Sequence, residues 1–439
     1  MDQQLRLKKI TEILATEPIG YQNVFYNNRP MDMPVHRVPV ELTIFNQHNH
    51  RIASWIKTLT AEQDEPDAST PEGEKIIMDL LYASDEQKNE KTIADIKRKG
   101  QQQVGVITKD GVVADGNRRC LALRKLEERG EGNQFFLAAI LPHTFEGNRR
   151  EIMQLETMLQ LGVDDKVDYD PIQKYIKVSD LIAEGYTPLQ IAGFMGDKES
   201  KIKEYQEIFS LMDRYLEYIG AIGAYQILVE KKLEGYFFNL AQYVKRYQGG
   251  RPTDSNWTAT DPDINDLIEL HFDYFRLEAI KSSGDEDEDN KGKSGKYGSQ
   301  ELRPLGNPAK GSGIFLREEI WKPFLKQHDD AMDSVEEKSL DEIKQQEGLT
   351  TVAAIRHKDR EFTRKVSSNL RENFERAKEN LQNHREKDRP KDLLASALKK
   401  LEACQKADDT KIIGRSEIES LAKEINQTSY DIMQWARGK

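Results

Sequence analysis

Residues 112–126 read VVADGNRRCLALRKL, and this stretch decides how the fold is interpreted. A short β-rich run, Val112 to Ala114, leads into Asp-Gly-Asn-Arg-Arg at 115–119, and leucines then recur on one side of a helix. Glycine lets the backbone turn tightly, and the free amides at a helix N-terminus attract anions. Arg118 and Arg119 add fork-shaped donors that suit phosphate oxygens. The stretch is therefore predicted to be a strand–turn–helix that binds a phosphate-bearing ligand.

The local charge around this stretch is opposite in sign to that of the whole chain. The 439 residues carry a formal net charge of −11, whereas Lys91 to Lys125 contains nine Lys and Arg against three Asp, a net of +6. Because phosphate binding needs a local excess of Lys and Arg, the composition excludes a uniformly basic nucleic-acid coat. The local excess coincides with the predicted anion site.

The remaining composition predicts a cytoplasmic protein, with association with the nucleoid as one option. No apolar run approaches the roughly 20 residues that cross a bilayer, so no membrane partner is expected. The N-terminal stretch is charged and amphipathic, unlike a secretory signal. Cys120 and Cys404 lie far apart and form no disulfide framework.

The pattern along the chain predicts five parts. Residues 1–30 are predicted to be an N-terminal helical arm, and 31–165 a small α+β domain with a hairpin around Asp110-Gly111. Residues 166–280 are predicted to be helical. Residues 281–313 contain the acidic run DEDED and are predicted to be a flexible linker, and 314–439 a charged helical domain.

Several segments resemble the ParB/sulfiredoxin-like superfamily in their order. These are VPVELTIFNQHNHR at 38–51, the long stretch 92–123 that ends in the Gly-Asn-Arg-Arg box, and a glutamate-containing helix followed by YDPIQ at 169–173. A helix–turn–helix comes last, so the resemblance covers roughly 35–220. It implies an α+β ParB/sulfiredoxin-like N-terminal domain followed by mainly α-helical helix–turn–helix and C-terminal domains.

Departures from the family pattern narrow the expected chemistry. Sulfiredoxins carry a catalytic cysteine where this chain has Asn117, and Cys120 does not restore the thiol. ParB proteins, which bind and hydrolyse CTP, usually have Glu there, and Asn cannot act as a base. The string also resembles the Asp-Gly-Gln-His-Arg signature of a group found in DNA-modification and phage-defence systems. A second Gly-Asn-Arg-Arg at 147–150 shows that the short string alone is not specific.

The resemblance implies a set of site residues for CTP or ATP with Mg²⁺. Glu156 would be the metal ligand and catalytic residue, and the alternative for it is a solvated helix position. The residues expected around the nucleotide are Asn49, Arg51, Asp115, Gly116, Asn117, Arg118 and Arg119.

A helix–turn–helix is predicted around Gly196, with Thr187 as the cap of its first helix. Lys198, Lys201 and Lys203 are the expected DNA contacts. However, 171–220 carries six Lys and Arg against eight Asp and Glu, which leaves a helical hairpin without DNA binding as the alternative.

The C-terminal region has two amphipathic stretches, around 362–381 and 418–435. They predict either an intramolecular bundle or a homodimer interface, and the second agrees with the dimerising C-terminal region of ParB proteins.

Three functions remain open at this point. The first is a ParB-like protein that couples a CTP or ATP state to DNA or partner binding, with slow hydrolysis and a partner ATPase. The second is an NTPase or nuclease associated with phage defence or DNA modification, working with a defence-system protein. The third is a non-catalytic adaptor.

Overall fold

The computed structural model describes residues 1–132, 134–161, 170–252, 255–277, 302–306, 313–406 and 414–438, the side chains at 385–389 and 392 excepted. Two compact units are present, Met1–Phe374 and Glu375–Lys439. None of the helices in these ranges combines the length and apolar character that a membrane crossing requires.

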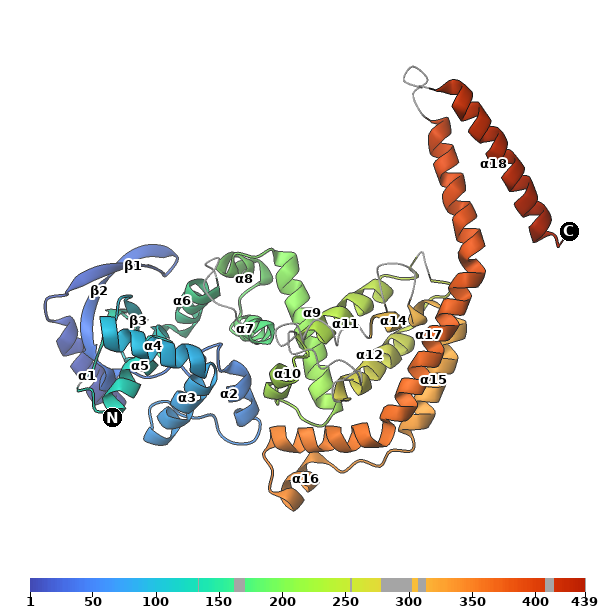
Figure 1. The fold of residues 1–439 in the computed structure, drawn as a ribbon. Coiled ribbons are helices and arrows are strands. Elements are labelled where there is room, and N and C mark those ends of the chain that lie inside the picture. The colour runs from blue at the N-terminus through green and yellow to red at the C-terminus, as the bar shows by residue number, and fades with distance from the viewer. Residues whose placement is uncertain are drawn as a thin grey trace. The chain divides into compact units, whose positions relative to one another are not determined.

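A five-stranded sheet forms the N-terminal part of the first unit, in the order β1-β2-β5-β3-β4 (Figure 1). Only β3 and β5 pair in parallel among these strands; the other neighbours are antiparallel. The strands are β1 Gly20–Tyr26, β2 Arg29–Pro39, β3 Gly105–Ile107, β4 Val113–Asp115 and β5 Phe135–Ile140. The predicted hairpin is β3–β4, and Gly111 in its turn has a φ of +91°.

The strand β1 lies within the part of the chain that was predicted to be a helical arm, residues 1–30. Helix α1, Gln3–Leu14, is present as expected, but the chain then turns back through Asn27 and Asn28, whose φ angles are 52° and 59°. Two left-handed residues in a two-residue connection are typical of a tight hairpin, and asparagine tolerates that conformation. Ile10 is fully buried, so α1 also belongs to the domain and is not an arm.

Helices cover both faces of this sheet. Alternate residues of β5 point to opposite sides: Phe136 packs with α3 and α5, whereas Ala139 packs with α6. The helices of this part are α2 Ala53–Thr60, α3 Pro71–Ala83, α4 Glu86–Lys99, α5 Asn117–Glu128 and α6 Arg149–Leu161. The chain is therefore an α+β domain at this end, as the sequence predicts.

The rest of the described chain is helical. In the first unit follow α7 Pro171–Ala183, α8 Pro188–Met195, α9 Glu199–Tyr218, α10 Gln226–Glu230, α11 Glu234–Gln248, α12 Asp261–Arg276, α14 Arg303–Gly306, α15 Glu318–Met332 and α16 Leu340–Glu347. Helix α17, Thr351–Gln405, runs from the first unit into the second, which also holds α18, Arg415–Ala436. Most of the predicted linker 281–313 lies outside the described residues.

Buried amides and hydroxyls join the α+β domain to the helices that follow. Ser54 of α2 donates its hydroxyl to Gln226 Oε1 at 2.8 Å and accepts from Gln173 Nε2 at 2.7 Å. All three side chains are at most 5% exposed. Because a buried polar group that loses its partner is costly, these bonds fix how α7 and α10 meet α2.

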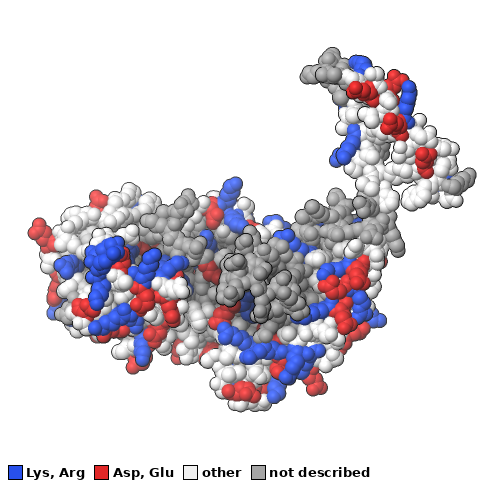
Figure 2. Space-filling view, in the orientation of Figure 1, with Lys and Arg blue, Asp and Glu red and all other residues white. Residues whose placement is uncertain are grey.

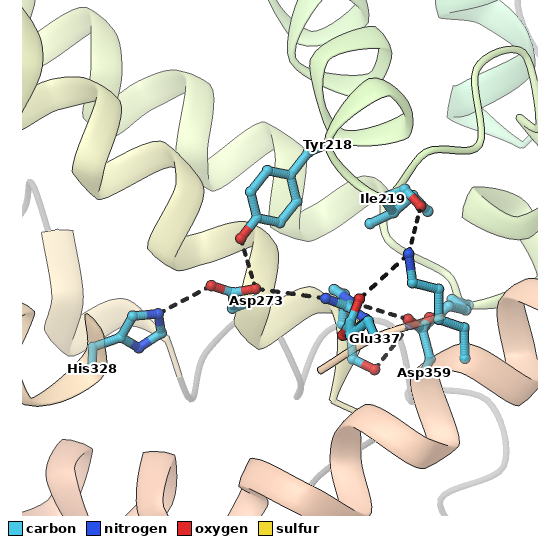
Figure 3. Close-up of polar contacts among 9 residues, drawn as sticks. Tyr218, Ile219, Asp273, His328, Glu337 and Asp359 are labelled. Atoms are coloured by element: carbon cyan, nitrogen blue, oxygen red, sulfur yellow. Dashed lines mark hydrogen bonds and ion pairs between the residues drawn. The ribbon is translucent and has the colours of Figure 1, made fainter. Parts of the chain in front are cut away.

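A buried cluster of charges ties residues after the predicted linker to the helical part (Figure 3). Arg276 of α12, which is 4% exposed, lies with its Nε 3.2 Å from Asp359 of α17 and is also paired with Glu337. Asp273 accepts from Tyr218 at 2.9 Å and from His328 at 3.1 Å. The first unit extends to Phe374, which differs from the predicted boundary at 314. Arg276 and Asp273 take some of their partners from beyond that boundary, namely Glu337, Asp359 and His328.

The cluster predicts an asymmetry between two arginines. Arg276→Met leaves the Asp273 and Asp359 carboxylates buried with fewer partners, and we expect a loss of about 3–5 kcal/mol in the free energy of unfolding. Arg214→Met is the control, since Arg214 pairs with Glu269 at the surface, 3.1 Å away; we expect a loss below about 1 kcal/mol. Urea unfolding of both variants measures the difference, and equal losses would contradict the role of the cluster.

Candidate functional site

A cavity of about 740 Å³ lies where β4 leads into α5. Separate segments of the α+β domain meet there: β1, the loop after residue 45, α4, the loop before β3, the β4–α5 junction and the end of α6. Its lining consists of Gln22, Asn23, Val24, Asn49, Arg51, Thr92, Gln102, Gln103, Val104, Val106, Asp115, Gly116, Asn117, Arg118, Arg119, Leu159 and Gln160. The structure thus brings together all seven residues that were predicted to surround a nucleotide.

Gly116 shapes the entrance to α5. It occupies the N-cap position with a φ of +99°, which side-chain-bearing residues rarely adopt. A Cβ atom here would lie 2.9 Å from Cζ of Phe136 and 3.0 Å from Nη2 of Arg119. Helix α5 therefore begins without a side-chain cap, and the first residues of its positive end line the cavity.

The two arginines of this turn are held in place by acidic groups. Arg119 lies 2.6 Å from Asp115 and also donates to the carbonyl and the side chain of Gln103, at 3.3 and 3.2 Å. Arg118 lies 3.6 Å from Asp85. Burial raises the pKa of Asp85, but hydrogen bonds from Lys88 and the charge of Arg118 outweigh it and hold the pKa below its ordinary value. Both guanidinium groups are therefore prepositioned, at 20% and 19% exposure, for an anion that enters the cavity.

Asn117 lines the cavity, but its side-chain amide is engaged in holding the backbone. Its Nδ2 donates to the Val113 carbonyl at 3.0 Å, and its Oδ1 accepts from the Asn46 amide at 3.2 Å. The residue is 3% exposed. A donor and an acceptor are needed at once, and an asparagine amide supplies both, whereas a Glu carboxylate only accepts and a Cys thiol donates and accepts weakly. The geometry therefore accounts for an asparagine at this position.

The loop that carries Asn49 and Arg51 is fixed by its own asparagines. Asn46 Oδ1 accepts from the His48 amide at 2.9 Å, and Asn49 Oδ1 accepts from the Arg51 amide at 3.0 Å. Burial lowers the pKa of His48 to about 4, so its imidazole is neutral at pH 7. No group of three or more metal-ligating side chains is found within the described residues.

Glu156 lies apart from the cavity lining. Its carboxylate is 1% exposed and 2.8 Å from the ammonium group of Lys177, which is 2% exposed. Burial raises the pKa of Glu156, while the charge of Lys177 and its hydrogen bond act in the opposite direction. The described geometry gives Glu156 a buried ion pair between α6 and α7, and a Mg²⁺ ion would have to compete with Lys177 for it.

The helix–turn–helix has the predicted shape with weakened charge. Thr187 forms a capping box with Gln190, and Gly196 turns the chain with a φ of +70°. Of the expected DNA contacts, Lys198 is exposed at the N-cap of α9, but Lys201 lies 2.6 Å from Glu204 and Lys203 lies 2.6 Å from Glu199. These lysines lie outside the cavity lining.

Helix α11 also packs against α9 and contacts two of its glutamates. Gln242 donates to Glu204 at 2.7 Å, and Lys245 lies 3.8 Å from Glu207. Part of the helix that was expected to read DNA is therefore in contact with another helix of the same chain.

The second Gly-Asn-Arg-Arg has a structural role. Arg149 lies 3.0 Å from Glu184, and Arg150 lies over the Tyr186 ring, 4.3 Å from its centroid. These contacts anchor the start of α6 to the end of α7. The same four letters thus line a cavity at 116–119 and pack two helices together at 147–150.

Sequence reasoning missed the amide-bearing residues of the lining. Gln22 and Asn23 come from β1, and Gln102, Gln103 and Gln160 come from a loop and a helix end. The alternating stretch YQNVFY followed by two asparagines was the signal for the first two, because it is typical of a strand that enters a tight hairpin.

Comparisons with known proteins add little to this geometry. No family model matches the chain, and no curated protein matches it. One solved structure that matches is the C-terminally truncated chromosome-partitioning protein ParB from Caulobacter crescentus, complexed with CTP-gamma-S. It is 13% identical, covers 54% of this chain and 98% of its own, and has a TM-score of 0.17. The site is therefore interpreted from its own geometry.

The buried ion pair predicts a pH-dependent defect in one variant. Lys177→Met removes the cation beside Glu156, and we expect a loss of about 3–5 kcal/mol in the free energy of unfolding at pH 7. Without the lysine the folded carboxyl keeps a proton that the unfolded chain releases, so stability rises as the pH falls. The deficit should shrink by up to about 1.4 kcal/mol per pH unit between pH 7 and about 5.

Urea unfolding at pH 7, 6 and 5 measures this deficit. Lys174→Met, on the same helix, is the control, and we expect a small effect that does not change with pH. Adding Glu156→Gln to Lys177→Met should restore part of the stability at pH 7. A deficit that is equal at all three pH values would contradict the ionised pair.

Proposed function

We propose that the chain binds a nucleoside triphosphate, CTP or ATP, in the cavity at the start of α5, and that the nucleotide state is coupled to the binding of DNA or a partner. The observation that carries this proposal is the prepositioned pair Arg118 and Arg119 at an uncapped helix N-terminus inside a cavity of about 740 Å³. Small-molecule sites commonly enclose about 300–1,000 Å³, so a nucleotide fits by size.

The remaining lining supports a nucleotide over a bare phosphate. Side-chain amides from Gln22, Asn23, Gln102 and Gln160 surround the arginines. Amides both donate and accept, and can therefore recognise the edge of a base or the hydroxyls of a ribose. Arg51 adds a third cation to the lining. The phosphates would thus contact the arginines, and the base and the sugar would contact the amides.

The donor set does not fit a Mg²⁺ ion held by the protein. Asp115 is the carboxylate in the lining, and it is 2.6 Å from Arg119, while Glu156 is 2.8 Å from Lys177. Mg²⁺ usually takes one or two carboxylates beside the phosphates. We therefore propose that the arginines, without a metal ion held by the protein, neutralise the charge of the phosphates. Hydrolysis, if it accompanies binding, would be slow, with the arginines stabilising the charge that develops as water attacks.

A nucleotide panel tests this proposal. Thermal unfolding with CTP, ATP, GTP, UTP or pyrophosphate should show stabilisation by at least one triphosphate, by about 2.7 kcal/mol when the ligand is at 100 times its Kd. Arg118→Ala plus Arg119→Ala should abolish the shift, because both phosphate donors are lost. Arg149→Ala plus Arg150→Ala is the control and should keep it, even if the baseline Tm falls. No shift with any ligand, or the same shift in the first variant, would refute nucleotide binding here.

We also propose that the chain forms a homodimer through α18. None of the side chains that are described for this helix is buried. Six large apolar residues are between 39% and 66% exposed, namely Ile418, Leu421, Ile425, Tyr430, Met433 and Trp435. An exposed apolar stripe of this kind on an otherwise charged helix favours association with another helix.

Sedimentation equilibrium tests the dimer. Leu421→Lys plus Trp435→Lys should raise the dimer Kd at least tenfold, since burying each apolar side chain contributes about 1.5–3 kcal/mol. Lys423→Gln, on the charged side of the same helix, should leave the Kd unchanged. A wild-type chain that sediments as a monomer at all concentrations would contradict the dimer.

A further inference from the structure

A second hollow adjoins the nucleotide cavity along α4. It has a volume of about 770 Å³ and shares Thr92, Gln102, Gln103 and Arg119 with the lining of the first. Four shared residues mean that a ligand in one hollow lies against the same side chains as a ligand in the other. The two hollows therefore adjoin at these four side chains, and the two together are called the groove.

The charge of this groove is opposite to that of the chain. The lining of the second hollow contains Lys91, Arg98, Lys99 and Arg119 against one acid, Asp95. With Arg51, Arg118 and Asp115 from the first hollow, the whole groove has six basic and two acidic residues, a net of +4. The full chain carries −11. Figure 2 shows Lys and Arg side chains gathered over α4 on the face that is drawn.

These cations are accessible to a ligand. Arg98 and Lys99 have side chains that are 72% and 51% exposed, and both pair with Asp95, at 3.1 and 3.0 Å. Exposed pairs of this kind are weak and are readily exchanged for a phosphate oxygen. Lys91 is exposed and makes no ion pair within the described part of the chain. A polyanion can therefore contact the side chains of Lys91, Arg98 and Lys99 without a change in the fold.

We propose that this groove binds single-stranded nucleic acid, with one of its nucleotides in the cavity at the start of α5, in place of a free nucleotide, and the following phosphates on Lys91, Arg98 and Lys99. Each hollow has the volume of one small-molecule site, so together they accommodate adjoining nucleotides of a strand. The bases of a duplex are paired and cannot enter the hollows, so a duplex would contact only the edges of the groove. Gln102 and Gln103 line both hollows and carry amides of the kind that unpaired bases can use, whereas both amide atoms of Gln101 are bonded to the backbone of Leu137.

The proposal moves the nucleic-acid contact away from the helix–turn–helix. There the lysines at 201 and 203 are paired with glutamates of their own helix, each at 2.6 Å, and α11 covers part of α9. In the groove one acid faces four cations in the second hollow. This inference rests on the proposed function in one respect, namely that the cavity at the start of α5 accepts a nucleotide. The contacts of a strand with the α4 cations do not depend on that proposal.

Fluorescence anisotropy with the full chain tests the groove. The probes are a labelled 12-nucleotide DNA strand, an RNA strand of the same sequence and the corresponding DNA duplex, at 50, 100 and 200 mM salt. Lys91→Gln plus Arg98→Gln plus Lys99→Gln should weaken strand binding at least tenfold. Its slope of log affinity against log salt should fall by about 2, since each lost contact to a single strand removes about 0.7. Lys198→Gln plus Lys201→Gln plus Lys203→Gln is the matched control and should stay within about twofold of wild type.

The outcomes separate this inference from the nucleotide proposal. The groove variant should keep its Tm and its nucleotide-induced thermal shift, because the arginines at 118 and 119 are intact. RNA that shows the same dependence on the α4 cations supports a phosphate-tracking groove. Absence of strand binding, tighter binding of the duplex, or a larger loss in the control triple than in the groove triple would overturn the inference. If no nucleotide shifts the Tm but the α4 triple still weakens strand binding, the nucleotide proposal fails and the groove stands.

Discussion

The left-handed turn at Gly116 is the constraint on which the site depends. With a φ of +99° and no room for a Cβ atom between Phe136 and Arg119, the chain leaves β4 and enters α5 without a cap. The positive end of α5 and the two arginines consequently lie at one cavity. A side chain at 116 would both strain the backbone and displace the arginine that a phosphate is proposed to contact.

Asn117 shows why this turn keeps its shape. Its side-chain Nδ2 donates to the Val113 carbonyl, and its Oδ1 accepts from the backbone amide of Asn46. The loop that carries Asn49 and Arg51 is therefore bonded to the same junction. Asn117 is thus used to hold the backbone of the junction. Glu156, which is not among the residues that line the cavity, is likewise used for a structural contact, its ion pair with Lys177.

The local balance of cations and acids distinguishes the surfaces of this chain. The lysines at 201 and 203 of α9 are paired with glutamates one helical turn away, and Arg149 and Arg150 are used to pack α6. The groove along α4 has more cations than acids in its lining. An acidic chain can therefore present one basic groove, and that groove continues from the proposed nucleotide site.

The sequence by itself determined the local elements near the site, because turns, caps and hydrophobic periods act over a few residues. The strand–turn–helix at 112–126, the β3–β4 hairpin, the end of α4 at Gly100 and the cap at Thr187 follow from such signals. Only the tertiary structure decided that the Gly-Asn-Arg-Arg at 116 faces a cavity while its copy at 147 packs a helix, that Gln22 and Asn23 join the lining, and that Glu156 meets Lys177. The physical reason is that a cavity and a buried ion pair are made by side chains from segments that are distant in sequence, whose meeting no local pattern encodes.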